Sequence, residues 1–121
     1  MSVEDFDLIT VRTEPAGDAV VVHVSGELDL STADVAEAEL GQAVGSGAPA
    51  VIVDLDRVSF LGSTGLRVLL TARDRANDSG VDLRLVGGHR VVLRPLQVSG
   101  LMPAFQVHAT IPDAIAALAA V

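Results

Sequence analysis

Two adjacent hydroxyl residues, Ser63 and Thr64, lie between glycines in the segment Phe60–Leu66, where an apolar run meets a pattern with helical spacing. The N-terminus of a helix favours negative charge, because its first N–H groups are free and the helix dipole is positive there. Ser and Thr are also common helix caps, so the simplest interpretation is that one of them caps the helix. One cap accounts for one hydroxyl only, and a second interpretation is that the loop holds a phosphate ligand.

Known catalytic and phosphate-binding motifs do not match this loop. Its glycines lack the spacing of the phosphate-loop and dinucleotide-binding fingerprints. A nucleophile elbow requires a glycine two residues before the serine, where this chain has Leu61. No sequence motif places a base beside Ser63, so a small hydrolase built around that serine is a weaker alternative. We expect no catalytic residue in this chain.

Two pairs of carboxylates follow predicted strands. Glu27 and Asp29 lie in the segment Gly26–Asp29 and could form an acid–base pair, but a solvated loop is the default interpretation. Asp54 and Asp56 are expected to end a parallel strand, near the edge where ligands approach such a sheet. They could hold a metal, yet no histidine is close in sequence, so structural or surface roles are favoured.

The histidines do not have the spacing of a metal site, and none is assigned a function: His23, His89 and His108. His23 alternates with valines, which places it on the less buried face of a strand. We therefore expect neither a metal ion nor another cofactor.

The composition excludes several further classes of chemistry. Without cysteine, the chain has no thiolate nucleophile, zinc–thiolate site or iron–sulfur cluster. All eight basic residues are arginine, and both Schiff-base chemistry and a Walker-type phosphate loop need lysine. A net charge of −8 disfavours nucleic acid as a partner and favours a basic patch on another protein.

The sequence shows no targeting or membrane segment. Residues Met1–Thr10 carry three acidic side chains, whereas a signal peptide begins with basic residues and continues with an apolar run. The longest apolar stretch, Ala114–Val121, is too short to span a bilayer. We expect a cytoplasmic protein that does not interact with a membrane.

The first part of the chain predicts a hairpin and a helix. Short strands are expected at Leu8–Arg12 and Ala19–Ser25, joined by a turn at Pro15–Asp18, so the two strands should be antiparallel. A helix follows, and Ser31 with Asp34 three residues later resembles a capping box. Its apolar face is predicted at Ala33, Ala36, Leu40, Ala43 and Val44. The segment Gly45–Gly47 is predicted to end it.

Three strands then alternate with three helices. Strands are predicted at Ala50–Val53, Leu83–Val86 and Phe105–His108, and helices from Ser63 to Gly80, at His89–Ser99 with an internal Pro95, and from Thr110 onward. Alternation of this kind predicts an α/β fold with a mostly parallel mixed sheet of about five strands and about four helices. The length of 121 residues fits one domain over residues 1–121.

Three separated segments resemble STAS domains. Val51–Leu66, VIVDLDRVSFLGSTGL, is similar to their third strand and phosphorylatable serine loop. Gly26–Asp29, which leads into Ser31–Ala33, and the turn Ser99–Leu101 also match, in the same order along the chain. STAS domains that stand alone at this length are similar to bacterial anti-sigma factor antagonists. The resemblance therefore implies a single STAS-type domain.

The resemblance implies a switch and no enzyme. In that family the unmodified protein binds an anti-sigma factor, often a serine kinase that brings its own ATP and Mg²⁺, and so releases a sigma factor. Phosphorylation switches the antagonist off, and a serine phosphatase restores it. The phosphate acceptor would be Ser63, with Thr64 as the second choice. The alternative is a STAS-type ligand-binding or accessory domain that acts without phosphorylation.

The resemblance also implies a partner-binding surface, made of Glu27, Asp29, Gly62, Ser63, Thr64, Gly65 and Arg67. The family usually has Asp where this chain has Gly62, and loss of that acid would alter recognition by the kinase. Pro95 in the predicted third helix is a second departure from the family pattern.

Overall fold

The computed structural model describes residues 8–119. A five-stranded sheet has the order β1-β2-β3-β4-β5; β1 and β2 are antiparallel and the other pairs are parallel. The strands are β1 (Ile9–Ala16), β2 (Ala19–Leu28), β3 (Ala50–Leu61), β4 (Asp82–Val86) and β5 (Gln106–His108). The helices are α2 (Ala33–Val44), α3 (Ser63–Ser79), α4 (Arg90–Val98) and α5 (Ile111–Ala119), with a 3₁₀ turn η1 (Met102–Ala104). The predicted order of elements and the α/β fold are confirmed.

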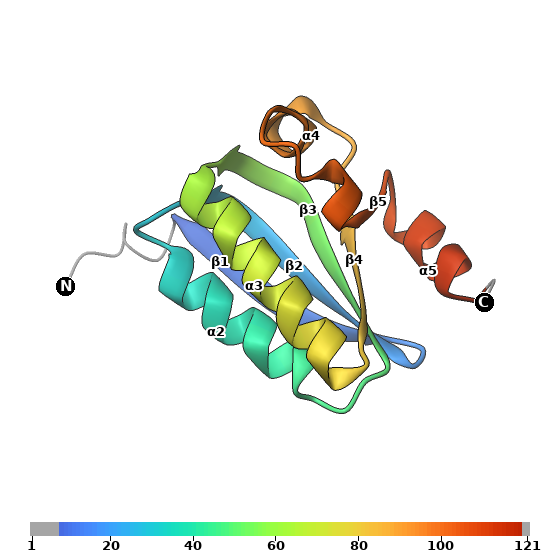
Figure 1. Cartoon of the computed structure of the whole chain (residues 1–121). Coiled ribbons are helices and arrows are strands. Elements are labelled where there is room, and N and C mark those ends of the chain that lie inside the picture. The colour runs from blue at the N-terminus through green and yellow to red at the C-terminus, as the bar shows by residue number, and fades with distance from the viewer. Residues whose placement is uncertain (1–7, 120–121) are drawn as a thin grey trace.

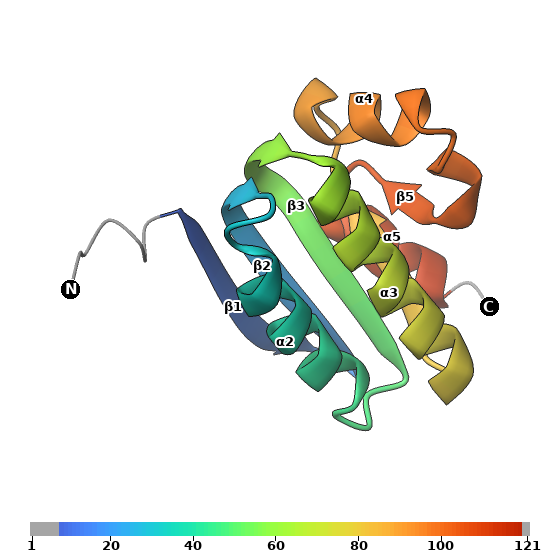
Figure 2. The ribbon, with the colours of Figure 1, turned by 60° about the vertical axis from the view of Figure 1, so that its left-hand side comes forward.

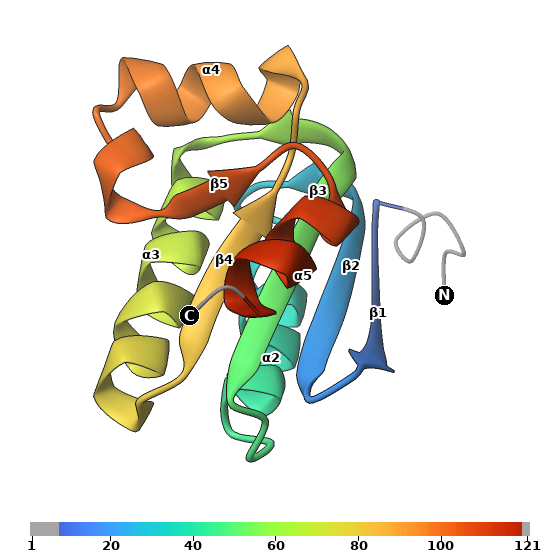
Figure 3. The same cartoon turned by 90° about the vertical axis from the view of Figure 1, so that its right-hand side faces the viewer.

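The helices cover the sheet unequally. Helices α2 and α3 lie side by side on one face, α5 lies on the other, and α4 crosses the end of β3 that leads into α3 (Figures 1, 2 and 3). Neighbouring valines on β2 lie on opposite faces of the sheet, because successive side chains of a strand point to opposite sides. Val22 lies in the large core under α2 and α3, whereas Val21 packs with Ile52, Val86 and Ala114 under α5.

The hairpin is longer than predicted. The β1–β2 ladder runs without interruption from Ile9↔Gly26 to Ala16↔Ala19, so the turn contains only Gly17 and Asp18. Gly17 has φ +62°, as tight two-residue hairpin turns require. Pro15 was expected in the turn but lies within β1, which is possible because β1 is an edge strand and a missing N–H can face away from the ladder.

The predicted helix ends are partly correct. Helix α3 begins at Ser63 and ends before Gly80, which has φ +70°. At α5, which was predicted from Thr110 onward, the Thr110 hydroxyl accepts the Asp113 N–H at 3.1 Å and so caps the start of the helix. Helix α4 is one residue shorter at each end than predicted and contains Pro95.

The capping box predicted at Ser31 is wrong. Thr32 occupies the N-cap position of α2 without a side-chain cap bond, because its hydroxyl bonds to the preceding loop. The helix itself buries the predicted face of Ala33, Ala36, Leu40, Ala43 and Val44.

Strand β3 differs most from the prediction. It was expected to end near Asp54, yet it continues to Leu61, so Asp54 and Asp56 lie within the strand. Its register against β2 shifts twice, between His23 and Ser25 and between Gly26 and Glu27, and each shift adds one residue on β3. Such bulges bend a strand and re-aim the residues after them. None of the helices formed by residues 8–119 is long and apolar enough to cross a membrane.

Candidate functional site

The two hydroxyls lie in the first turn of α3. Strand β3 ends at Leu61, and a single residue, Gly62, separates it from the helix. Gly62 is the N-cap residue, and no side chain forms a cap hydrogen bond, so the interpretation that one hydroxyl caps the helix is wrong. Ser63 is exposed and Thr64 is half-buried. The Ser63 hydroxyl is therefore accessible to a second protein and is not used as a cap.

Gly65 fixes the helix against the end of β2. A Cβ on Gly65 would lie 2.6 Å from the Leu28 carbonyl oxygen and 2.8 Å from Cδ1 of Leu61. The same Leu28 oxygen accepts the Gly62 N–H at 3.1 Å. Only glycine permits this close approach, so the loop around Ser63 and the end of β2 form one packed unit.

The loop after β2 holds itself together through hydrogen bonds. The Asp29 carboxylate accepts the Ser31 N–H at 2.9 Å and the Ser31 hydroxyl at 2.8 Å. Buried Thr32 accepts the Asp29 N–H at 3.1 Å and donates its hydroxyl to the Glu27 carbonyl at 2.7 Å. The hydrogen bond from the Ser31 hydroxyl is the main cause that lowers the pKa of Asp29 below its ordinary value. Asp29 is therefore ionised at neutral pH and part of the loop's own framework.

Gly26, at the start of the segment Gly26–Asp29, has φ +104° and lies close to the backbone of Leu8 and Ile9. A Cβ there would collide with the Leu8 carbonyl oxygen. Position 26 therefore requires glycine on both counts.

The structure brings the predicted site residues together. Glu27 pairs with Phe60, and Leu28 with Leu61, across β2 and β3. The loop after β2 therefore lies beside the loop that carries Ser63. A groove of about 440 Å³ between α2 and α3 begins at this point, and it is lined by Leu30, Ala33, Asp34, Glu37, Thr64, Arg67, Val68 and Thr71.

Two exposed apolar side chains flank the site and were missed in the sequence. Leu30 is 79% exposed and Phe60 is 50% exposed. The sequence around each residue could have indicated that it is exposed. Leu30 follows a polar loop, and Phe60 is next to Ser59, in a segment that interrupts the apolar pattern of β3. Exposed large apolar side chains beside polar and charged groups are typical anchors of protein interfaces.

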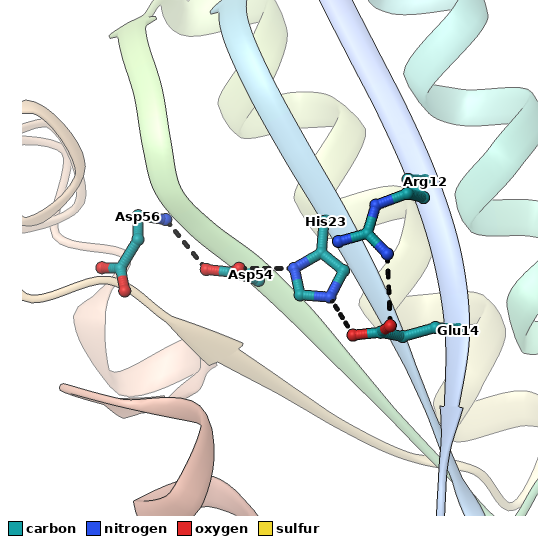
Figure 4. Close-up of polar contacts among 5 residues, drawn as sticks. All are labelled: Arg12, Glu14, His23, Asp54 and Asp56. Atoms are coloured by element: carbon teal, nitrogen blue, oxygen red, sulfur yellow. Dashed lines mark hydrogen bonds and ion pairs between the residues drawn. The ribbon is translucent and has the colours of Figure 1, made fainter.

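A second polar cluster lies on the α5 side of the sheet (Figure 4). The His23 ring contacts the Asp54 carboxylate through Nδ1 and the Glu14 carboxylate through Nε2, both at 2.7 Å. Arg12 donates to the other Glu14 oxygen at 3.1 Å. The second Asp54 oxygen accepts the Asp56 N–H at 3.1 Å. These contacts tie three strands together at the first bulge of β3.

Hydrogen bonds within this cluster account for the buried carboxylate of Asp54. An ionised carboxylate only accepts hydrogen bonds, so both His23 contacts form fully when each ring nitrogen carries a proton. Asp54 is buried and its acceptors are used by His23 and by the backbone of the bulge. Within residues 8–119 no group of three or more His, Cys, Asp or Glu side chains is arranged to hold a metal ion.

Comparisons with known proteins agree with this architecture. The anti-sigma-F factor antagonist RsfB of Mycobacterium tuberculosis is 34% identical over 109 residues, which cover 90% of this chain and 88% of RsfB. The crystal structure of an anti-sigma factor antagonist from Mycobacterium paratuberculosis has a TM-score of 0.86 and 33% identity, with 97% of each chain covered.

The anti-sigma factor antagonist SpoIIAA from Bacillus is a further structural relative. Its unphosphorylated form has a TM-score of 0.76 and 25% identity, covering 93% of this chain and 98% of SpoIIAA. Its phosphorylated form has a TM-score of 0.68 at the same identity, covering 90% of this chain and 99% of SpoIIAA. The family model of the STAS domain matches residues 10–114. This chain therefore belongs to the STAS domain family, as its three sequence segments indicated.

Proposed function

We propose that this protein is an anti-sigma factor antagonist that works as a phosphorylation-controlled switch in the bacterial cytoplasm. Unmodified, it binds an anti-sigma factor that is also a serine kinase, and a sigma factor is thereby released. Its relatives RsfB and SpoIIAA are named as anti-sigma factor antagonists. The observation that carries the proposal for this chain is the exposed Ser63 hydroxyl, which begins α3 without serving as its cap.

The proposed partner-binding surface combines charge with apolar anchors. Glu27 lies near the end of β2 and Asp29 in the loop after it, beside the loop that carries Ser63, and Arg67 lies one helical turn after Ser63. Leu30 and Phe60 add exposed apolar side chains to the same two loops. Acidic groups at the rim steer a basic partner, while desolvated apolar side chains supply most of the affinity.

Phosphorylation of Ser63 would change the partner surface more than the fold. A phosphate adds roughly −1.5 to −2 charge and three acceptor oxygens. The free N–H groups and the dipole of α3 stabilise that charge at the helix N-terminus. The partner, which has packed against a neutral hydroxyl, instead meets a dianion beside the acidic side chains of Glu27 and Asp29. Steric and electrostatic repulsion are sufficient for release.

The residue before the proposed phosphate acceptor is Gly62 in this chain, and this affects how a kinase would recognise the loop. The resemblance implies that the family usually has Asp at this position, whereas Gly62 adds no charge beside Ser63, and a Cβ there would lie 3.0 Å from Cε2 of the Phe60 ring. We infer that the kinase recognises the loop through Glu27, which pairs with Phe60 across β2 and β3, and through Asp29, in the loop that follows β2. The kinase brings ATP and Mg²⁺, and a serine phosphatase restores the hydroxyl, so this chain needs no cofactor.

Incubation with candidate anti-sigma factor kinases and ATP, followed by mass spectrometry, tests the proposal. The expected result is one phosphate on Ser63 and none on the Ser63→Ala variant. Phosphate on Thr64 alone would move the acceptor by one residue. No phosphate on either residue, with a partner that binds regardless of ATP, would favour a ligand-binding or accessory STAS domain.

A further inference from the structure

The last segment of β3, residues 55–61, is the stem that carries the Ser63 loop. The β3–β4 ladder ends at the pair Asp54↔Val86, so among residues 8–119 the stem has a strand partner only in β2 from residue 55 onward. Helix α4 lies at the other edge of the stem, where β4 no longer runs (Figures 1 and 2). A bulged strand that is paired on one side needs support on the other if its position is to be fixed.

His89 supplies that support from the start of α4. Its Nε2 atom lies 3.1 Å from the carbonyl oxygen of Val58, in the middle of the stem. A carbonyl oxygen only accepts, so Nε2 carries the proton and donates. The Nδ1 atom is buried and has no hydrogen-bond partner among the described residues. The Nε2–Val58 hydrogen bond is therefore the one polar contact of the ring among the described residues.

The backbone of His89 is itself rigidly anchored. Its carbonyl accepts the N–H groups of Val92 and Leu93 in the first turn of α4. Val92 and Leu96 are fully buried in the large core, so the helix cannot shift without opening that core. The imidazole therefore transmits the position of α4 to the stem.

We propose that His89 is a positioning residue for the Ser63 loop. The stem and loop are tied from two sides: Gly62 donates to Leu28 on the β2 side, and Val58 accepts from His89 on the α4 side. Loss of the second tie leaves β3 free to fluctuate about its bulges, and Ser63 with it. The inference concerns the geometry of the loop, and only its kinase readout rests on the proposed function.

Hydrogen exchange at backbone amides tests this role directly. His89→Leu keeps an apolar side chain of similar size without a donor, whereas His89→Gln keeps an N–H₂ group that can reach the Val58 carbonyl. We expect His89→Leu to speed exchange of the amides of residues 58–64 by roughly three- to tenfold, the effect of losing one hydrogen bond. His89→Gln should restore most of the protection.

Leu40→Ala is the matched control, because it removes core volume on α2 and destabilises the whole domain but leaves the partners of the His89–Val58 hydrogen bond in place. It should change exchange at residues 58–64 only as much as in the rest of the core. If His89→Leu fails to fold, His89→Asn replaces it, since its shorter amide cannot reach Val58. The proposed role of His89 would be overturned if residues 58–64 exchanged at the wild-type rate in His89→Leu or its replacement His89→Asn. It would also be overturned if His89→Gln did not restore protection.

A second readout separates this inference from the proposed function. With a kinase that modifies the wild type, kcat/KM for Ser63 should fall in His89→Leu and recover in His89→Gln. If the wild type accepts no phosphate from any kinase, the proposed function fails, and the exchange experiment alone decides the role of His89.

Discussion

Gly65 in the first turn of α3 packs directly on the carbonyl of Leu28 at the end of β2, with room for a hydrogen and none for a methyl group. This contact joins two segments that are far apart in the sequence, the acidic loop after β2 and the loop that carries Ser63. The proposed partner surface is therefore a single rigid unit.

Gly65→Ala should destabilise the domain by about 2 kcal/mol or more, because the new Cβ would overlap a backbone oxygen and two side chains that cannot move away. Gly41→Ala in α2 is the control: there a Cβ meets only the end of the exposed Arg75 side chain. That variant should gain roughly 0.5–1 kcal/mol from helix propensity. Urea unfolding measures both, and equal effects would contradict the packing argument.

Ser63→Ala should bind the partner as the unmodified protein does and remain bound when ATP is added. Ser63→Glu should bind at least about tenfold more weakly, because a carboxylate then faces the partner next to Glu27 and Asp29. Calorimetry with the purified anti-sigma factor gives both affinities. Thr64→Ala controls for a general disturbance of the helix start, and tight binding of Ser63→Glu would contradict release by charge.

Asp29→Asn should slow association with a basic partner surface at low salt and have little effect at high salt, since screening weakens steering by exposed charges. Its amide oxygen can still accept the Ser31 hydrogen bonds, so the loop should keep its shape. Asp29→Arg should have a larger effect in the same direction. Asp18→Asn makes the same charge change at the far end of β2, and an equal effect there would mean that only net charge matters.

The unfolding free energy should decrease as the pH falls below about 4.5. Hydrogen bonding to His23, and then to Arg12, lowers the pKa of Glu14 from its ordinary value of 4.5, and hydrogen bonding to Ser31 lowers the pKa of Asp29 from 3.8. A carboxyl with a lower pKa in the folded state stabilises it above the unfolded-state value, and this is lost as the pH falls through the folded-state value.

Urea titrations between pH 3 and pH 7 measure this dependence. Glu14→Gln should flatten it, because the substitution removes a carboxyl whose pKa is lowered in the folded state. An unchanged slope in Glu14→Gln would show that its contact with His23 contributes nothing to stability.

Local patterns were sufficient to predict the order of elements. Helical spacing located the buried face of α2, and a continuous apolar run located the start of β3 at Ala50. The end of β3 could not be predicted, because two bulges and the polar residues Asp54 and Asp56 interrupt the period of two. Their polarity is typical of a loop, whereas in the sheet Asp54 pairs with His23 of β2 and Asp56 lies in the first bulge, between paired residues.

The site was predicted only in part for the same reason. Ser63 and its neighbours form a local motif and were identified from the sequence. Contacts between distant residues were not, since His23 and Asp54 are 31 residues apart, as are Val58 and His89. The cap at Ser31 was mispredicted because Asp29, two residues earlier, competes for its hydrogen bonds.

Because β3 contains two bulges, the number of residues between Asp54 and Ser63 determines where the Ser63 loop lies. Removing one residue from this segment would move each later side chain of the strand to the place of the one before it, so that Leu61 would take the exposed position of Phe60 and leave the core. Ser63 would also start α3 about 3.3 Å nearer to the body of the sheet. A substitution in this segment should therefore disturb the position of the Ser63 loop less than the insertion or deletion of a single residue would.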